Sequence, residues 1–457
     1  MNGNSIRIGA SAKWTMGALA LATASVSYAS SNTLVGGGST LPVIAYAGDS
    51  INNPVYPAGV GSVFGVFSAQ AGNPSVSYCK TSDAIALNVL TGSPGFNVQD
   101  ACPANGFGAG TVGRADLTQP NYVVLGSPLN ASDYLDYQNS HPAGDYPVEF
   151  PAIAGAIAIA FNLTDSLGNQ VTSSEVNFTD GQICSIFSGQ VTNWSDPRLT
   201  SAFTLTDGAS IPANPINVQY RSDGNGTSFS FSSHLATVCG TINNEVFETS
   251  RGFTSVVANF FPLGLPPNWV GSSSDATLIQ GIGSTSGSIG YVETANALAT
   301  IPSPQLADVN GKSPLINFGN PLTITAVSLL YNEVISNVNN ANGTAAVETI
   351  GAIPGVTNPP TTQCIALVKP SLYAKPAVPG GIVPSTSYPI VAISYLLANS
   401  EGNTSTDLMA IRGLLTAPYT SSITSQVTTV GPGTGLAFLT LGSNAFTTNQ
   451  IRGCLVN

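Results

Sequence analysis

The sequence has 457 residues, of which only 8% are charged, and a formal net charge of −11. This acidic balance argues against nucleic acid as a partner, because its phosphates bind clustered cations, and it gives no attraction to an anionic membrane surface. A hydrophobic content of 43% can supply a core, so the chain is not of the disordered class. Since the length exceeds what one core usually serves, we expect two lobes or domains.

The first 29 residues have the pattern of a secretory signal peptide. Arg7 and Lys13 precede an apolar stretch at 14–24, and Ser27-Tyr28-Ala29 forms a small-x-small cleavage pattern. We therefore expect an exported chain that starts near Ser30, in the periplasm or outside the cell. Its formal charge would be −13, because residues 1–29 carry two cations and no acidic residue. No later stretch is long and apolar enough to predict membrane insertion.

The cysteines predict disulfides rather than a metal site. The chain has six Cys, no C-x-x-C pair and only two His, so the spacing of a zinc site is absent and we expect no metal or cofactor. An even number of Cys in an exported chain favours disulfides. Six Cys allow 15 pairings, from which we choose the sequential one: Cys79–Cys102, Cys184–Cys239 and Cys364–Cys454.

In chain order, short apolar runs alternate with helical patterns, which predicts an α/β fold. A strand at Thr33–Val35 precedes Gly36–Gly38 and two hydroxyl residues, a turn that could present backbone N–H groups to an anion. Val76–Tyr78 is expected to be a short strand. Ala154–Phe161 is a continuous small and apolar run, suited to a buried strand.

The segment 221–228 carries the clearest chemistry. It follows a predicted strand at Ile216–Tyr220 and opens a helix in which apolar residues recur at Phe231, Leu235 and Val238. The first turn of a helix offers unpaired N–H groups at the positive end of the dipole, and Arg221 adds a fork of donors suited to a tetrahedral oxyanion. The segment therefore predicts an anion site.

At this point the chain resembles the periplasmic phosphate-binding component of the phosphate-specific transport system, including the secreted DING proteins. The motif R-S-D-G-N-G-T-S-F at 221–229 is similar to the ligand loop of that family. Four further segments match in the family's order: G-G-G-S-T-L-P at 36–42, F-P with Gly155 at 150–155, I-F-S-G through N-W at 186–194, and G-S-I-G-Y-V-E at 287–293.

The resemblance implies a two-lobed type II periplasmic-binding-protein fold, with mixed sheets flanked by helices, that closes on one phosphate. Lobe I would comprise residues 30–152 and 299–457, and lobe II residues 153–298. The implied phosphate ligands are Ser39, Thr40 and Leu41 from lobe I, and Arg221, Asn225, Gly226 and Thr227 from lobe II. Asn225 stands where the family has serine. Asp223 is expected to pair with Arg221 and hold it in place.

Two further ligands have alternatives. The family's serine after an early strand corresponds to Ser82, with Ser62 as the alternative. The aspartate that accepts a proton from the bound anion corresponds to Asp116, with Asp83 as the alternative. Such a carboxylate would reject fully ionised sulfate, because sulfate has no proton to donate.

The resemblance also supports one disulfide and several functional alternatives. A pair equivalent to Cys184–Cys239 occurs in the DING proteins. We expect a monomer that captures inorganic phosphate for uptake, with an ABC-type permease as a possible partner, or for scavenging. The alternatives are a secreted DING-type phosphatase, for which the chain offers no acid/His cluster, and a structural or adhesive protein that retains the fold.

Overall fold

The computed structural model describes residues 32–92, 95–206, 208–339, 347–354 and 363–456. The predicted signal peptide lies outside these residues. Among the helices of the described ranges, none combines the length and the apolar character needed to cross a membrane.

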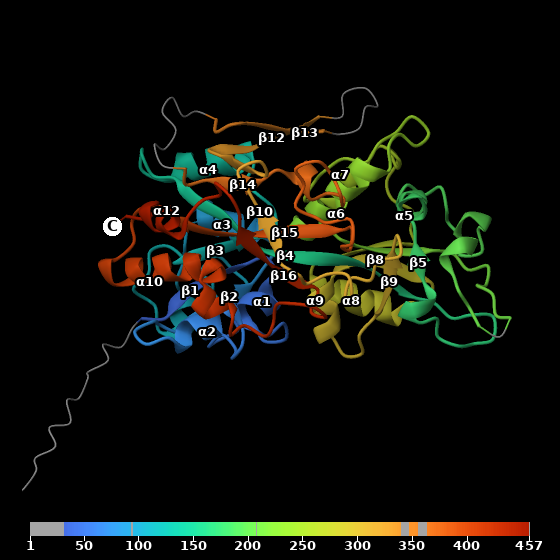
Figure 1. Ribbon diagram of the computed structural model, residues 1–457, viewed down its shortest axis with the longest axis horizontal. Helices are drawn as coiled ribbons and strands as arrows, with labels where there is room; N and C mark the ends of the chain where they lie inside the picture. Colours follow the sequence, from blue (N-terminus) through green and yellow to red (C-terminus); the bar gives the residue numbers. More distant parts are fainter. Residues whose placement is uncertain (1–31, 93–94, 207, 340–346, 355–362, 457) are drawn as a thin grey trace, which may run out of the picture. The chain divides into compact units, whose positions relative to one another are not determined.

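One long strand, β4 (Pro147–Asn162), runs through the middle of the main sheet (Figure 1). All but its last residue are buried, as expected of a continuous small and apolar sequence. Strand β15 (Val391–Asn399) pairs antiparallel with its first part, and β8 (Ser288–Glu293) pairs antiparallel with its second part. The buried strand predicted at 154–161 is therefore confirmed as part of β4.

Two groups of three parallel strands flank this centre. In the first group, β1 (Leu34–Gly38) lies between β2 (Val76–Lys80) and β3 (Tyr122–Leu125). In the second, β6 (Asn217–Arg221) lies between β7 (Trp269–Ser272) and β8. The strand order is β2-β1-β3-β15-β4-β8-β6-β7.

The register shows that the carboxyl ends of both groups point toward the same stretch of β4. The end of β3 is level with β4 through β15, because Leu125 pairs with Tyr395 and Tyr395 pairs with Pro151. The end of β8 approaches from the other direction, where Glu293 pairs with Ile157. Ligands of α/β proteins bind beyond the carboxyl ends of parallel strands, so the fold directs two sets of such ends to one place.

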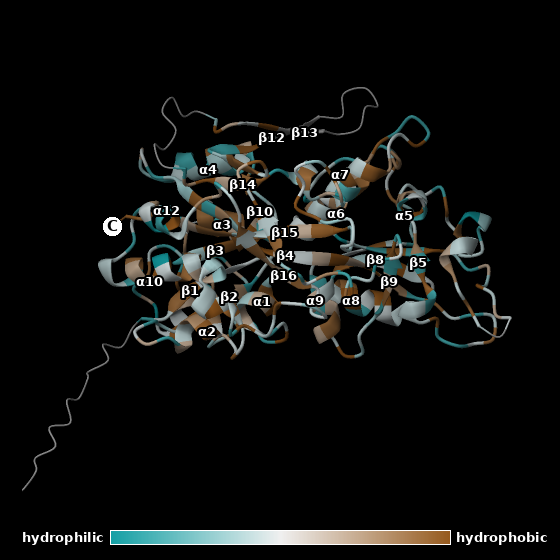
Figure 2. Ribbon diagram, viewed as in Figure 1, coloured by the Kyte–Doolittle hydropathy of each residue, from teal (hydrophilic) through white to brown (hydrophobic). Residues whose placement is uncertain are grey.

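Four helices that follow these strands begin at side-chain caps. Each capping side chain accepts a hydrogen bond from the backbone N–H three residues on, which satisfies one of the unpaired donors of the first turn. The caps are Ser82 for α3 (Asp83–Thr91), Asn130 for α4 (Ala131–Ser140), Asn225 for α6 (Gly226–Val238) and Ser274 for α8 (Asp275–Ser284). Hydrophobic colour is concentrated on the inner strands, whereas α4 is largely hydrophilic (Figure 2).

Gly36–Gly38 lie within β1, so the turn expected there is corrected. Their small size is required by close packing against both neighbouring strands. A Cβ atom on Gly36 would lie 2.4 Å from the carbonyl oxygen of Tyr122, and one on Gly37 would lie 2.1 Å from that of Cys79. The glycines thus serve strand packing, and the chain leaves the sheet only after Gly38.

The remaining helices are α1 (Val43–Ala47), α2 (Val63–Ala69), α5 (Asp180–Phe187), α7 (Phe253–Val256), α9 (Thr294–Ala299), α10 (Ser405–Thr416), α11 (Ser421–Thr424) and α12 (Thr448–Gly453). The remaining strands are β5 (Asn177–Phe178), β9 (Gln305–Val309), β10 (Leu322–Ile324), β11 (Leu329–Tyr331), β12 (Glu333–Asn339), β13 (Val347–Ala352), β14 (Ala366–Val368) and β16 (Leu436–Leu441). Of these strands, β5, β9, β10 and β16 extend the main sheet, whereas β11 with β14 and β12 with β13 form two separate two-stranded sheets.

All three predicted disulfides are present: Cys79–Cys102, Cys184–Cys239 and Cys364–Cys454. They leave no free cysteine among the described residues. By their contacts, residues Ser31–Asn457 form one unit. The division into lobes at residues 153 and 298 stays a prediction.

Candidate functional site

Arg221 is the centre of the site. As the last residue of β6 it stands at a carboxyl end of the parallel strands, and it is only 1% exposed. Its Nε and Nη2 donate to the two carboxylate oxygens of Asp223, each at 2.7 Å. This two-point contact fixes the plane of the guanidinium. The third nitrogen, Nη1, makes no hydrogen bond to any described residue.

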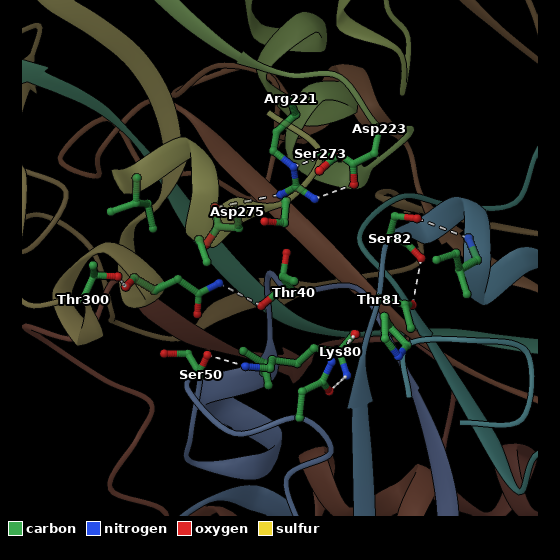
Figure 3. Close-up of a pocket in the computed structure, with 18 residues that line it drawn as sticks. Thr40, Ser50, Lys80, Thr81, Ser82, Arg221, Asp223, Ser273, Asp275 and Thr300 are labelled. Carbon is green, nitrogen blue, oxygen red and sulfur yellow. Dashed lines mark hydrogen bonds and ion pairs between the residues drawn. The ribbon is translucent and has the colours of Figure 1, made fainter. Parts of the chain in front are cut away.

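A cavity of about 290 Å³ opens beside Arg221 (Figure 3). Four predicted site residues line it: Thr40, Ser82, Arg221 and Asp223. Residues without a predicted role complete its polar wall, and these are Ser50, Asn53, Lys80, Thr81, Ser273, Ser274, Asp275, Asn296 and Thr300. The structure thus brings Thr40 and Ser82, from the first group of strands, to the same cavity as Arg221 and Asp223 from the second.

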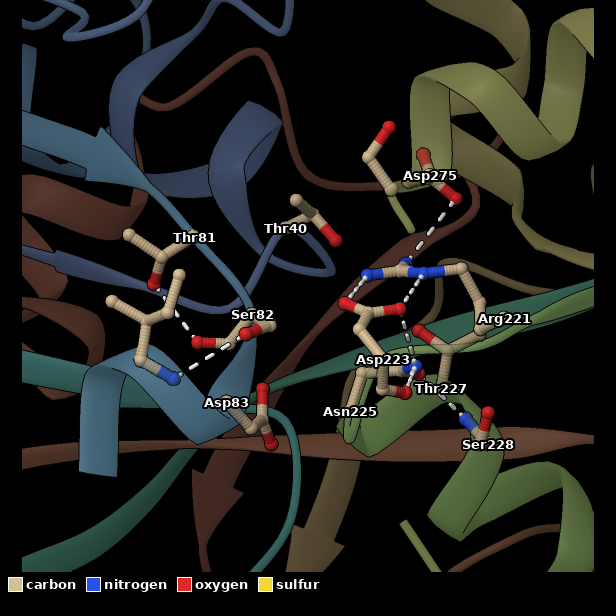
Figure 4. Close-up of polar contacts among 12 residues, drawn as sticks. Thr40, Thr81, Ser82, Asp83, Arg221, Asp223, Asn225, Thr227, Ser228 and Asp275 are labelled. Atoms are coloured by element: carbon tan, nitrogen blue, oxygen red, sulfur yellow. Dashed lines mark hydrogen bonds and ion pairs between the residues drawn. The ribbon is translucent and has the colours of Figure 1, made fainter. Parts of the chain in front are cut away.

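The start of α6 is held by Asn225. Its Oδ1 accepts a hydrogen bond from the Ser228 N–H at 2.8 Å, and its Nδ2 donates to the backbone oxygen of Asp223 at 2.8 Å (Figure 4). Both ends of the amide are therefore engaged within the turn. Asn225 is placed as a helix cap that supports Asp223, rather than as a free donor for an anion.

Gly226 occupies a position where only glycine fits. A Cβ atom there would lie 2.1 Å from the carbonyl carbon of Gly126, just after β3. The Ala84 N–H also donates to the Gly224 oxygen at 3.3 Å. The turn before α6 is therefore in direct contact with the segments that follow β2 and β3.

Glu293 joins the two sides of the site. It is the last residue of β8, and its Oε1 accepts hydrogen bonds from the hydroxyls of Thr40, at 2.8 Å, and Thr227, at 2.5 Å. The same oxygen lies 3.7 Å from Arg221 Nη1. The other carboxylate oxygen accepts a hydrogen bond from the Asn296 side chain.

Asp275 is a second buried carboxylate near Arg221. It opens α8, and its Oδ1 lies 3.9 Å from Arg221 Nη1. Burial raises the pKa of Asp275, although the Arg221 charge opposes this shift. Burial and then the charge of Asp275 raise the pKa of Glu293 to about 8. Desolvation of a carboxylate favours its protonated form, so the raised pKa of Glu293 favours a proton on this residue near neutral pH.

Asp83, the alternative proton acceptor, lies next to Ser82 at the start of α3. Its Oδ2 accepts hydrogen bonds from the Gly126 N–H at 3.0 Å and from the Ser127 hydroxyl at 3.2 Å. Its other oxygen is buried and makes no hydrogen bond of normal geometry to the described part of the chain, although the Ser39 side chain lies near enough to lower the pKa of Asp83. Burial raises the pKa of Asp83 to about 6, against the opposing charge of Arg251.

Asp116, the first choice for that role, is not brought to the cavity. Its carboxylate accepts from Arg114 Nε at 2.8 Å, and its side chain is 53% exposed. Arg114 also pairs with the buried Asp407 at 2.7 Å. Asp116 therefore belongs to an ion-pair cluster apart from the cavity wall.

Seven other predicted residues do not line the cavity either. Four of them, Asp83, Asn225, Gly226 and Thr227, lie at the starts of α3 and α6 described above, and the others are Ser62, Leu41 and Ser39. Ser62 caps α2 and donates to the Gly59 oxygen at 2.6 Å. Leu41 is buried, with a side-chain carbon 3.3 Å from the Cβ position of Gly155. Ser39 is buried, and its backbone oxygen accepts the Tyr78 hydroxyl at 2.5 Å. Ser39 and Leu41 thus position Thr40 between them.

The sequence interpretation missed Glu293, Asp275 and Lys80. The position of each residue in the sequence could have indicated a role, because each lies at the end of a parallel strand or at the start of the following helix. Glu293 was part of a recognised motif, but no role was assigned to it. Lys80 is half-buried, and burial lowers its pKa while the charge of Asp49 opposes that shift. Within the described ranges, no group of three or more His, Cys, Asp and Glu is arranged to hold a metal ion.

Comparison with curated proteins gives three informative relatives. Alkaline phosphatase L of Pseudomonas aeruginosa is 27% identical over 301 residues, covering 65% of this chain and 66% of that protein. Phosphate-binding protein PstS 2 of Mycobacterium tuberculosis is 29% identical and covers 43% and 46%. PstS of Xylella fastidiosa is 31% identical and covers 33% and 36%. The chain spans less than two thirds of the length of each of these relatives.

Solved structures and a family model define the fold more broadly. A phosphate-binding protein from Stenotrophomonas maltophilia superposes with a TM-score of 0.53 at 19% identity, covering 88% of this chain and 90% of that one. A phosphate-bound periplasmic DING protein gives 0.51 at 18%, with the same coverage. These likenesses show the mixed α/β fold. The model of the PBP superfamily domain matches residues 122–410, more than half of the sequence, and the chain therefore belongs to the PBP superfamily.

Proposed function

We propose that this protein captures inorganic phosphate in the cavity beside Arg221. The observation that carries the proposal is the buried guanidinium, which Asp223 fixes in two places while Nη1 makes no hydrogen bond to the described residues. A buried donor without a partner is costly. An oxyanion that accepts a hydrogen bond from Nη1 would remove that cost and gain a charge-assisted bond.

The surroundings of Arg221 suit a tetrahedral anion. The hydroxyls of Thr40 and Ser82 and the amine of Lys80 line the same cavity. The first turn of α6 adds the positive end of a helix dipole. Relatives named as phosphate-binding proteins support phosphate as the anion.

Asp83 is the proposed acceptor of the phosphate proton in place of Asp116. It follows Ser82 directly, and one of its oxygens is buried without a hydrogen bond among the described residues. Protonated phosphate can donate to this oxygen, whereas sulfate at neutral pH cannot. The arrangement would therefore favour phosphate over sulfate.

We further propose that the chain is exported and works as a monomer. The pattern of residues 1–29 supports export, and the three disulfides suit an oxidising compartment. A receptor in the periplasm would deliver phosphate to an ABC-type permease, whereas a protein released from the cell would act as a scavenger. The division into two lobes would let the cavity open and close.

The test is the affinity of Arg221 variants for phosphate. We expect Arg221→Ala to weaken binding by at least a hundredfold, since charged hydrogen bonds contribute roughly 1.5–3 kcal/mol and the buried carboxylates would lose their cation. Arg221→Lys should recover little, because an ammonium lacks the planar fork. Arg198→Ala is the matched control, since Arg198 forms an ion pair with Asp196 and is half-exposed. Unchanged affinity in Arg221→Ala would refute the site.

Hydrolysis of phosphate esters is the second candidate function, because one relative is named alkaline phosphatase L. It would use the same cavity, with phosphate as its product. The purified chain should be assayed with a chromogenic phosphate monoester. Turnover that disappears in Arg221→Ala would establish this activity, whereas turnover that survives would indicate a contaminating enzyme.

A further inference from the structure

Glu293 accepts hydrogen bonds from two residues that the sequence predicts as phosphate ligands, Thr40 and Thr227. The hydroxyls of both threonines donate their hydrogen bonds to Glu293 Oε1. A hydroxyl has one hydrogen to donate, so both threonines then present only lone pairs to other groups. While Glu293 is ionised, an arriving anion finds acceptors where it needs donors.

The charges around Arg221 also oppose the binding of an anion while Glu293 is ionised. One cation faces three carboxylates, those of Asp223, Asp275 and Glu293. With all four groups ionised the cluster has a formal charge of −2, which would repel an anion in a desolvated site. Protons on the cluster remove this repulsion.

Asp275 and Glu293 are the groups that can hold such a proton. Both lie close to the same nitrogen, because Asp275 Oδ1 is 3.9 Å and Glu293 Oε1 is 3.7 Å from Arg221 Nη1. Two buried carboxylates that share one cation repel each other, which favours a proton on one of them. Burial raises the pKa of both, and that of Glu293 reaches about 8. The other charged or titratable groups that act on the pair are Arg221, Asp223, Tyr78 and Lys80, whose charge interacts with that of Asp275.

We propose that Glu293 is a specificity-determining residue that must carry a proton for the anion to bind, so that capture of phosphate takes up a proton. This inference rests on the proposed function. When Glu293 is protonated, the hydroxyls of Thr40 and Thr227 are free to turn their hydrogens toward the anion. The anion in turn disfavours ionisation of Glu293, so binding and protonation reinforce each other.

The test is proton uptake during phosphate binding by the full chain. Isothermal titration in two buffers of different ionisation enthalpy gives the number of protons taken up for each phosphate bound. Because phosphate itself titrates near neutral pH, the informative quantity is the uptake of the parent minus that of Glu293→Gln. We expect this difference to be close to zero at pH 6.5, where Glu293 is already protonated, and to rise toward one at pH 9. Above pH 8 the ratio of the affinity of the parent to that of Glu293→Gln should fall about tenfold for each pH unit. Titration of phosphate affects both proteins equally, so it cancels in this ratio.

Glu293→Gln is the decisive variant, because an amide resembles the protonated acid. We expect its affinity to fall less steeply than that of the parent between pH 8 and 9, so that it binds phosphate more tightly than the parent at pH 9. Glu175→Gln is the matched control, since Glu175 accepts the Thr172 N–H in a capping turn and glutamine can do the same. This control should show the uptake of the parent.

Two results would overturn the inference without affecting the proposed function. One is equal proton uptake in the parent and in Glu293→Gln while both bind phosphate. The other is loss of binding in a Glu293→Gln variant that keeps the Tm of the parent, which would show that the negative charge itself is needed. If Glu293→Gln does not fold, Asp275→Asn replaces it. Removing the neighbouring charge should shift the uptake curve to lower pH, and an unmoved curve would refute the coupling.

Discussion

At the scale of single residues, the main feature of the site is that three carboxylates surround one buried cation, Arg221. Asp223 takes two of the three guanidinium nitrogens of Arg221, and Asp275 and Glu293 lie just beyond hydrogen-bonding distance of the third. A buried arginine without a partner would strongly destabilise the folded protein. The three carboxylates offset this cost and stabilise the guanidinium in its buried position. The same carboxylates moderate its attraction for an anion.

Asp83 and Asp116 can be separated by selectivity. We expect Asp83→Asn to reduce the preference for phosphate over sulfate by about ten- to a hundredfold, since an unsatisfied buried acceptor contributes roughly 1–3 kcal/mol of rejection. Asp116→Asn should leave the preference unchanged, because Asp116 is paired with Arg114 and half-exposed. Competition of each anion with radiolabelled phosphate measures both. A loss of preference in Asp116→Asn alone would reverse the assignment.

At the scale of elements, the ends of strands and starts of helices were the most predictable features. The pattern at 216–228 predicted a strand, a turn and a helix, and the structure contains β6 and α6 there. The three glycines of β1 were misassigned, because their packing against Tyr122 and Cys79 depends on strands distant in sequence. The sequence also left Asp83 and Asp116 as alternatives, because this choice likewise depends on how distant strands pair. The register of β2 and β3 determines which of the two carboxylates lies near the turn before α6.

The close approach of Gly226 and Gly126 predicts a strong effect of one methyl group. We expect Gly226→Ala to weaken phosphate binding by at least tenfold, because its Cβ would meet the backbone of Gly126 and move α6 away from the segment after β3. Gly283→Ala in α8 is the control, since no atom lies within 4 Å of its Cβ position. There alanine should be neutral or stabilise the helix by up to about 1 kcal/mol. Equal binding by both variants would contradict this contact.

The disulfide Cys184–Cys239 links α5 to the end of α6. It closes an interval of 55 residues. Loop entropy then predicts that the double variant Cys184→Ser/Cys239→Ser loses about 4 kcal/mol of unfolding free energy. Chemical denaturation of the double variant and the parent measures the difference. A loss below about 1 kcal/mol would show that packing alone holds the two helices together.

At the scale of the whole molecule, buried carboxylates make stability depend on pH. Burial raises the pKa of Glu149 to about 8, against an opposing hydrogen bond from the Leu129 N–H, and that of Glu293 to a similar value. The folded state therefore binds more protons than the unfolded state between about pH 4.5 and 8. Stability contributed by these groups is present at the acidic end and lost as the pH rises through 8.

Glu149→Gln isolates this effect outside the cavity. Glu149 is fully buried on β4, and one of its oxygens makes no hydrogen bond to the described residues. We expect the variant to be more stable than the parent at pH 8, by the order of a few kcal/mol, with the difference shrinking toward pH 4.5. Thermal unfolding at both pH values measures it. A difference of the same size at both would contradict the raised pKa.

All the predictions for the site depend on the proposed capture of phosphate in the cavity beside Arg221. The most direct measurement is isothermal titration of the phosphate-stripped protein at pH 7 with phosphate and then, separately, with sulfate. We expect one phosphate bound per chain and at least a hundredfold weaker binding of sulfate. Absence of binding by either anion would contradict the proposed capture and favour a structural or adhesive protein that retains the fold, while equal binding of both would remove the role of the buried carboxylates in selectivity.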